Sequence, residues 1–417
     1  MLRNVCHNFL VKIKTNFDLI INQFYSISNF IFSFGIALIT TKLITSNIMP
    51  ESYGVYRYVL AVVSLCSLTT ITGINKTLGG YVAKGFHGTV AKTTILSLKT
   101  GLSGVLFLAI YSSYSFFIDQ KIMQSYLLIL ATVCFLPYTI FSRYQSILAG
   151  LENFKLIFFY NFVQKISLFF LTVITLYVLK KGILVFGYSQ ILFTSLFFIF
   201  CYKRSIDLLR NNTIDPGFIK HSTTISIISL GSQIIAPGIQ LFLNFSLGTG
   251  ALALYVIGNR IPIQIANVVK PIMHPISIRL AKKTKLSYNK AVIKSIPLTL
   301  LLGTILYGFL YLGIEIFGPY IVDDSYIIAL DYAKNLGLFI ILSPTFSLLN
   351  SNVIFEKNNR AFSYSLFTNQ AVTITGYFLF LKNHGIISIA YTNFVALAIQ
   401  IIIMVVFLIR DITSKSR

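Results

Sequence analysis

Long apolar runs, separated by short polar breaks, follow one another along the whole chain. Most runs have about 20 residues or more, the length that a helix needs to cross the hydrocarbon core of a membrane. The pattern therefore predicts an all-α, polytopic membrane protein with twelve transmembrane helices. The predicted spans cover residues 19–43, 53–74, 95–118, 123–148, 155–179, 182–202, 223–247, 251–276, 295–317, 326–355, 361–381 and 385–409.

The composition points in the same direction. Of the 417 residues, 55% are hydrophobic and only 11% are charged. A soluble globular protein carries about 25% charged residues, so this chain lacks the charges that would solvate a globular surface. Disorder is excluded as well, because disordered chains have low hydrophobicity. The four cysteines show neither redox nor metal-binding spacing.

The charges of the chain are strongly basic, with 34 Lys and Arg against 12 Asp and Glu and a net charge of +22. Most of the basic residues, including Arg143 and those of a predicted loop at 279–294, fall in alternate breaks between spans. Cytoplasmic loops carry such a bias, which places both termini in the cytoplasm. The bias explains the basic excess without nucleic acid, and the 279–294 segment suits anionic membrane lipids.

The chain also repeats itself at about half its length. Three short segments recur in order: residues 54–56, 81–84 and 151–153 (GVY, YVAK, LEN) correspond to 253–255, 279–282 and 355–357 (ALY, RLAK, FEK). Because six helices return the chain to its starting side, the two halves have the same orientation. The repeat predicts two six-helix lobes, residues 1–205 and 206–417, related by a parallel pseudo-repeat.

Several of these segments resemble a known family. Residues 49–56 (MPESYGVY), 72–84, 251–282 and 383–390 are similar to stretches of the polysaccharide-exporting flippases in the multidrug/oligosaccharidyl-lipid/polysaccharide (MOP) superfamily. The last segment departs from the family pattern at Ser388 and Ile389, where those proteins carry Gly and Ala. By length and helix count the chain is most similar to O-antigen translocases.

The resemblance implies an inner-membrane protein with two lobes around a central cavity. Its members move undecaprenyl-pyrophosphate-linked oligosaccharides, such as O-antigen units, from the cytoplasmic to the periplasmic leaflet. The expected partners are this lipid-linked oligosaccharide, membrane lipids, and a polysaccharide polymerase with its chain-length regulator. No nucleic acid and no cofactor are expected.

Polar groups inside the predicted spans are the candidates for binding such a substrate. A cation in a span needs an aqueous interior or a partner, and a pyrophosphate needs cations and hydrogen-bond donors. The predicted substrate-binding residues are three cations and five amides, some of them at helical spacing: Arg57, Lys165, Arg260, Gln264, Asn161, Gln233, Gln240 and Asn29. Polar stripes also join helices to one another, so a packing role stays open for each amide, and structural pairing or snorkelling stays open for each cation.

Three further cations favour structural roles. Lys99 and Lys270 lie near the inner ends of spans, where long side chains snorkel to the interface, and Lys334 follows Asp331 by three residues, a spacing that favours an ion pair.

Two rival functions differ in the groups that they require. A cation-coupled multidrug exporter of the same superfamily needs carboxylates within its spans, and only Asp18 and Asp331 lie near any. A membrane polysaccharide polymerase or ligase needs room for catalytic groups outside the membrane, which the short breaks do not provide. The sequence shows no metal spacing, phosphate loop or nucleophile with a base, so we expect no enzyme.

Overall fold

The computed structural model of the protein describes residues 28, 31–179, 182–281, 285–355 and 359–413. Helices make up most of these ranges, short irregular segments connect them, and no strand occurs in them. Among the described residues, seven helices are long and apolar enough to cross a membrane, and the number rises to nine if each of two bent helix pairs is one span. The chain is therefore a multi-pass membrane protein, as the apolar runs predict.

The first half of the chain begins with a helix at Ile31–Asn47. The helices that follow it are α2 (Pro50–Cys66), α3 (Gly73–Ala83), α4 (Gly88–Phe117), α5 (Ile122–Ile140), α6 (Tyr144–Gly150), α7 (Phe154–Val173) and α8 (Ile183–Ile206), with short turns at η1 (Ser67–Thr70), η2 (Phe141–Arg143) and η3 (Ile174–Val178). The α2–η1 segment and α3 meet at an angle of 54°. Ile71, between them, has a positive φ of 54°, so the predicted span 53–74 ends in this bend.

The second half contains α9 (Phe218–Ala281), α10 (Lys285–Ile321), η4 (Asp324–Tyr326), α11 (Ile328–Leu336), α12 (Phe339–Phe355) and α13 (Asn359–Thr413). Two glycines interrupt the long helices: Gly248 divides α9 and Gly385 divides α13, with φ values of 88° and 60°. Glycine adopts positive φ without a steric penalty. Each break falls at the boundary that the sequence predicts between two spans, and we call the parts of α9 its first arm (218–247) and its second arm (249–281).

The prediction of a loop at 279–294 is wrong for most of these residues, because they are helical. Helix α9 continues to Ala281, and α10 begins already at Lys285, before the predicted start of the next span at Ser295. Lys, Leu and Ala are strong helix formers. Charged residues therefore extend these helices beyond the apolar runs instead of ending them.

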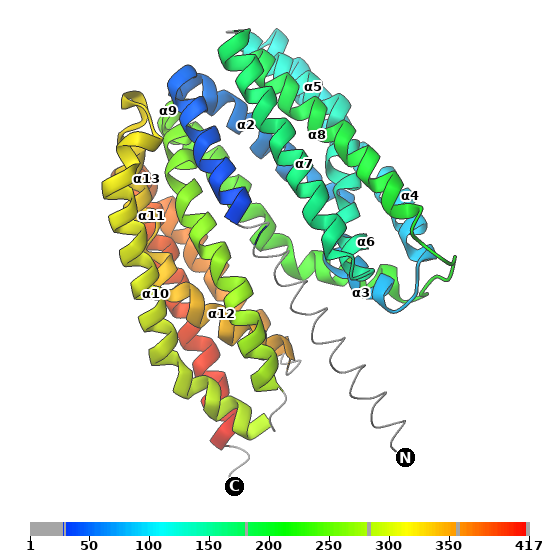
Figure 1. The fold of residues 1–417 in the computed structure, drawn as a ribbon, viewed down its shortest axis with the longest axis vertical. Coiled ribbons are helices and arrows are strands. Elements are labelled where there is room, and N and C mark those ends of the chain that lie inside the picture. The colour runs from blue at the N-terminus through cyan, green and yellow to red at the C-terminus, as the bar shows by residue number, and fades with distance from the viewer. Residues whose placement is uncertain (1–27, 29–30, 180–181, 282–284, 356–358, 414–417) are drawn as a thin grey trace.

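Two groups of helices meet at one end of the molecule and diverge toward the other, with α9 connecting them (Figure 1). At the meeting end, a Cβ on Gly54 of α2 would overlap the backbone of Thr249 in α9. The Tyr326 hydroxyl donates a hydrogen bond to the Ile48 carbonyl over 3.0 Å. A buried apolar core runs through α2, α5, α8 and α9 and joins both halves. These contacts hold what we call the closed end.

Large apolar side chains are exposed on many of the helices. Phe117, Leu298, Phe309 and Phe367 are examples from α4, α10 and α13, and each is more than half exposed. Apolar surface on this scale marks contact with a membrane or a partner. Together with the long apolar helices, it indicates that acyl chains cover these faces.

Candidate functional site

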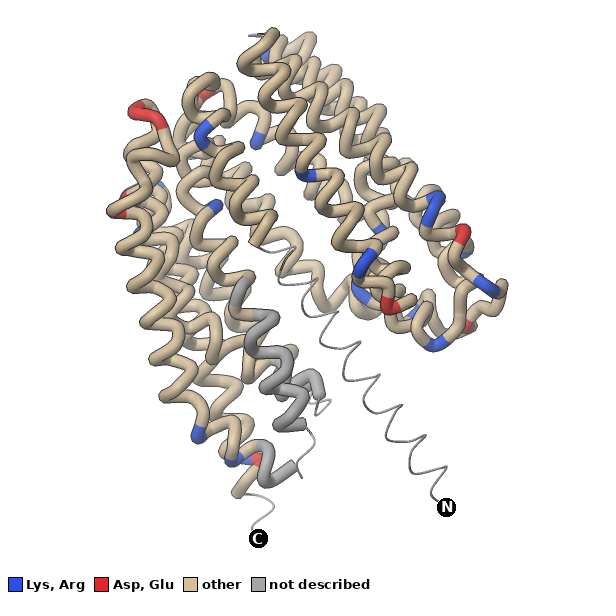
Figure 2. Tube along the Cα trace, viewed as in Figure 1, with Lys and Arg blue, Asp and Glu red and all other residues tan. Residues whose placement is uncertain are grey.

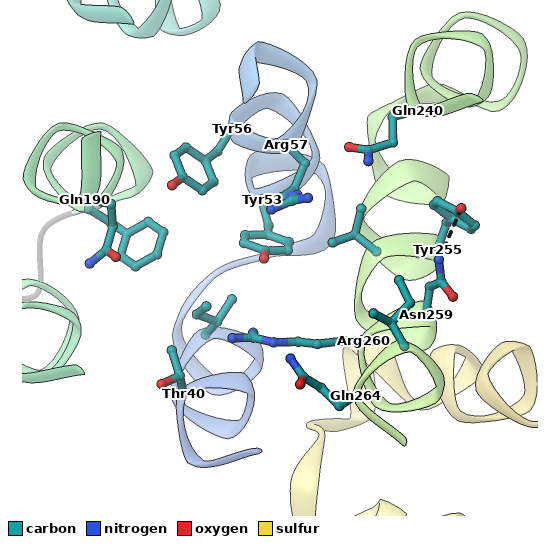
Figure 3. Close-up of a pocket in the computed structure, with 14 residues that line it drawn as sticks. Thr40, Tyr53, Tyr56, Arg57, Gln190, Gln240, Tyr255, Asn259, Arg260 and Gln264 are labelled. Atoms are coloured by element: carbon teal, nitrogen blue, oxygen red, sulfur yellow. Dashed lines mark hydrogen bonds between the residues drawn. The ribbon is translucent and has the colours of Figure 1, made fainter. Parts of the chain in front are cut away.

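A cavity of about 320 Å³ lies between the two halves of the chain. Its lining comes from the Ile31–Asn47 helix, α2, α8 and both arms of α9 (Figure 3). Most of the lining side chains are polar, aromatic or cationic. They are Thr40, Tyr53, Tyr56, Arg57, Gln190, Gln240, Tyr255, Asn259, Arg260 and Gln264, beside the apolar Ile44, Phe186, Val256 and Ile263. We call this space the cationic cavity.

Helical spacing brings the lining residues of α2 onto one face. Pro50 occupies the start of the helix, where its missing N–H costs nothing. Tyr53, Tyr56 and Arg57 then follow at i, i+3 and i+4, a spacing that stacks side chains on one face. The start of α2 therefore fixes where the Arg57 guanidinium enters the cavity.

The second arm of α9 presents a corresponding face from the other half. Arg260 and Gln264 are separated by one turn, and so are Tyr255 and Asn259, whose Nδ2 donates to the Tyr255 hydroxyl over 3.2 Å. Arg260 extends from α9 toward the Ile31–Asn47 helix, while the Arg57 guanidinium lies beside α2, next to Tyr53 (Figure 3). The break at Gly248 turns the arm so that it faces α2.

The cationic cavity concentrates positive charge without a counter-charge from the described residues. Its lining contains no carboxylate, and within the described chain neither guanidinium forms an ion pair or a hydrogen bond. The buried Nε of Arg57 has no acceptor there. Arg57 and Lys165 both lie within electrostatic range of Arg260. Figure 2 shows the described acidic residues near helix ends, while some basic residues lie along the helices.

The structure distributes the predicted site residues over several places. Arg57, Arg260, Gln240 and Gln264 line the cationic cavity together. Lys165 lies on α7, close enough to Arg260 to repel it, but outside the lining.

The remaining predicted amides are engaged elsewhere or are not described. The Asn161 Oδ1 accepts hydrogen bonds from the Gln145 amide at 3.1 Å and the Tyr144 hydroxyl at 3.4 Å, which ties α7 to α6. Gln233 donates to the Ser229 hydroxyl over 2.6 Å on its own helix. Asn29 lies outside the described residues.

Several residues that line the cationic cavity were not predicted from the sequence. Gln190 is an amide in an otherwise apolar run, and Asn259 directly precedes Arg260. Both signals were present in the sequence, because a polar residue within an apolar span seldom faces lipid. Tyr53 and Tyr56 carry no such signal, since aromatic residues make up 15% of the chain.

Arg143 is a second kind of buried cation. Its side chain is 1% exposed, and it donates to Asn75 Oδ1 at 2.7 Å, the Thr70 carbonyl at 3.0 Å, Ser97 Oγ at 2.7 Å and the Thr93 carbonyl at 3.3 Å. We call these five residues the Arg143 hub. The sequence pattern counts Arg143 among the cytoplasmic charges, whereas the structure uses it to bind the bend after η1 to α4.

The cations with predicted structural roles behave differently from one another. Lys334 contacts Asp331 at 3.6 Å, as its spacing predicts, and also Glu315 at 2.5 Å. Lys99 is exposed on α4, and the side chain of Lys270 lies outside the described part.

Solved structures of transporters resemble the whole chain. They include an inward-facing MATE multidrug-resistance transporter of the MOP superfamily, at 13% identity and a TM-score of 0.65 over 92% of this chain and 94% of that one. The lipid II flippase MurJ in an inward closed conformation matches at 14% identity and 0.68, over 93% and 87%. The chain shares the fold of these transporters.

A third similar structure comes from Pyrococcus furiosus, a MOP transporter whose binding pocket has reverse polarity (12% identity, TM-score 0.58, 96% and 94% coverage). No family model and no curated protein sequence matches the chain. At such identities the likeness establishes the fold, and the substrate has to be argued from the cavity.

Proposed function

We propose that the chain is a flippase that carries an undecaprenyl-pyrophosphate-linked oligosaccharide, such as an O-antigen unit, from the cytoplasmic to the periplasmic leaflet. The observation that supports this most is the cationic cavity, where Arg57 and Arg260 lack any partner among the described residues. Both side chains are half-buried, and a cation that is partly shielded from water without a partner is costly. An anionic ligand that enters between the two halves removes that cost.

The chemistry of the cavity suits the headgroup of such a lipid. A guanidinium binds phosphate oxygens through two parallel hydrogen bonds, and the pyrophosphate offers several such oxygens. The amides of Gln190, Gln240, Asn259 and Gln264 both donate and accept, as sugar hydroxyls do. The polyprenyl tail remains among acyl chains throughout.

The transport cycle that we propose uses the two halves as rigid bodies. Twelve spans form two six-helix lobes, 1–205 and 206–417, with both termini in the cytoplasm of an inner-membrane protein. In the present state the halves meet at Gly54–Thr249 and Tyr326–Ile48, which we place on the periplasmic side. Rocking of the lobes opens these contacts and closes the opposite end.

The product of this step is an oligosaccharide on the periplasmic leaflet, which a polysaccharide polymerase and its chain-length regulator then consume. We therefore propose these two as functional partners.

A cation-coupled multidrug exporter is the second candidate, because MATE transporters share the fold. Such an exporter holds protons, metal ions or cationic drugs on carboxylates. The described lining of the cationic cavity holds two guanidinium groups instead. A lipophilic cation would meet repulsion there.

Transport in proteoliposomes tests the proposal. The purified protein is reconstituted with a fluorescent undecaprenyl-pyrophosphate-linked sugar, and the fraction that becomes accessible to a membrane-impermeant quencher is followed over time. We expect flipping by the wild type and its loss in Arg57→Gln/Arg260→Gln. Each charge-assisted hydrogen bond contributes roughly tenfold or more in affinity.

Lys121→Gln is the matched control. Lys121 is an exposed cation paired with Asp119 at the start of α5, outside the cavity, so its loss changes the net charge and leaves transport unaltered. Undiminished flipping by the double variant would remove the cationic cavity from the mechanism.

A further inference from the structure

A second polar cavity, of about 310 Å³, lies within the first half of the chain. This volume is near the lower end of the range for small-molecule sites, about 300–1,000 Å³. The polar part of its lining consists of hydroxyls and one amide, with no charged side chain: Ser64, Ser67, Thr70, Thr72, Asn75, Tyr138, Thr139 and Ser142. We call it the hydroxyl cavity.

The hydroxyl cavity is a neighbour of the cationic cavity along α2. Arg57 and Ser64 lie at i and i+7, two turns apart, and so share one face of α2, and Ser67 follows directly at the start of η1. At about 1.5 Å per residue, Ser64 is roughly 10 Å from Arg57 along the helix axis. Tyr138 of the hydroxyl cavity lies within electrostatic range of Arg57 and Tyr56. One elongated ligand could therefore occupy both cavities.

Three hydroxyl groups of this cavity are oriented as acceptors. Ser67 donates to the Ser64 carbonyl at 2.6 Å, Thr139 to the Phe135 carbonyl at 2.7 Å, and Ser142 to the Thr139 carbonyl at 2.9 Å. Their protons are thus committed to the backbone, and their oxygen lone pairs remain for a ligand that donates. Polyols and sugars are such ligands.

The Arg143 hub determines which ligand charge is compatible with the hydroxyl cavity. Arg143 donates to the Thr70 carbonyl and to Asn75 Oδ1, and both residues line the hydroxyl cavity. Its positive charge therefore stands directly behind the wall and repels a metal ion or an organic cation. Because the Asn75 oxygen is occupied by Arg143, its amide nitrogen is left to donate. The wall favours an uncharged ligand with many hydroxyls.

We propose that the hydroxyl cavity is a sugar subsite. It binds the pyrophosphate-proximal sugar of a lipid-linked oligosaccharide while the pyrophosphate lies between Arg57 and Arg260. This inference rests on the proposed function and extends it, because it assigns recognition of the sugar to groups of the first half alone.

Equilibrium binding with two probes tests the subsite. The probes are undecaprenyl pyrophosphate and the same lipid linked to one N-acetylglucosamine, each titrated against the purified full-length protein in nanodiscs. We expect the wild type to bind the sugar-bearing probe about tenfold more tightly than the bare lipid. Thr139→Val/Ser142→Ala should abolish this difference and leave the affinity for the bare lipid unchanged.

The control variant is Thr132→Val/Ser113→Ala. These two hydroxyls also donate to carbonyls of their own helices, at 2.8 and 2.9 Å, and neither belongs to the lining of the hydroxyl cavity. The control should retain the tenfold preference, and thermal unfolding of both variants reports on their folding.

The outcomes separate the subsite from the function on which it rests. If the wild type binds both probes equally, or if Thr139→Val/Ser142→Ala keeps the preference, the sugar subsite is wrong while the flippase proposal stands. If the wild type binds neither probe, both are wrong. Arg57→Gln/Arg260→Gln should weaken both probes alike.

Discussion

Two cationic regions inside this protein, the buried Arg143 hub and the half-buried arginines of the cationic cavity, differ in how their hydrogen-bond donors are satisfied. In the Arg143 hub, one guanidinium has four partners, and two of them are backbone carbonyls: that of Thr70 at the bend after η1 and that of Thr93 within α4. In the cationic cavity, Arg57 and Arg260 have none among the described residues. A satisfied buried cation holds the fold together, whereas an unsatisfied one that faces a cavity is suited to a ligand.

The strongest test of this comparison removes the hub. Arg143→Leu removes four hydrogen bonds and leaves Asn75 Oδ1 without its donor, while Ser97 Oγ still donates to the Thr70 carbonyl over 2.9 Å. We therefore expect a loss of about 3 kcal/mol or more in the free energy of unfolding. Arg143→Lys should recover only part, since an ammonium cannot reproduce the planar fork. Thermal unfolding in detergent measures both, and wild-type stability in Arg143→Leu would contradict the structural role.

Neutralising the cationic cavity should stabilise the protein, whereas removing the Arg143 hub should destabilise it. In Arg57→Gln/Arg260→Gln the repulsion between two unpaired guanidinium groups disappears, so we expect the ligand-free protein to gain about 1 kcal/mol in stability. The same thermal unfolding experiment checks this. A large loss of stability would mean that these two arginines are structural like Arg143.

Lys165 should have an intermediate effect. It repels Arg260 from α7 without lining the cavity, so it adds to the positive potential at longer range. We expect Lys165→Gln to weaken binding of undecaprenyl pyrophosphate by about threefold, and more at low salt than at high salt. An effect as large as that of Arg260→Gln would place Lys165 in direct contact with the ligand.

The smallest change in stability and transport should follow the substitution of a cation that is already paired with carboxylates. Lys334 has two carboxylate neighbours, Glu315 and Asp331, which are 58% and 75% exposed. Exposed ion pairs contribute about 0–1 kcal/mol. Lys334→Gln should therefore change thermal stability slightly and leave transport unchanged. A transport defect in this variant would show that a cation paired with carboxylates also contributes to transport.

The helices were predictable from the sequence because their causes are local. Apolar runs gave the end of α4 and the start of α7 to within one residue, and the glycines at 248 and 385 lie where the chain changes direction. The bend after η1 and the helical start of α10 were not predictable. The first depends on Arg143 binding a carbonyl 73 residues away, and the second on charged residues continuing a helix.

The sequence was enough to predict that the candidate site is cationic, but not which amide residues line it. Charge within an apolar span singled out Arg57 and Arg260, and the structure places both in one cavity. The same reasoning could not separate Gln240, which lines that cavity, from Gln233, which bonds to Ser229. That distinction depends on how α9 is rotated against α2, which only tertiary packing determines.

The sign of the charge that the protein binds is the most direct test of the whole account. Undecaprenyl pyrophosphate and the lipophilic cation tetraphenylphosphonium are each titrated against wild-type protein in nanodiscs, with Arg57→Gln/Arg260→Gln beside it. We expect the wild type to bind the anionic lipid and not the cation, and the variant to lose binding of the anionic lipid. Tight binding of the cation by the wild type, without binding of the anion, would contradict it.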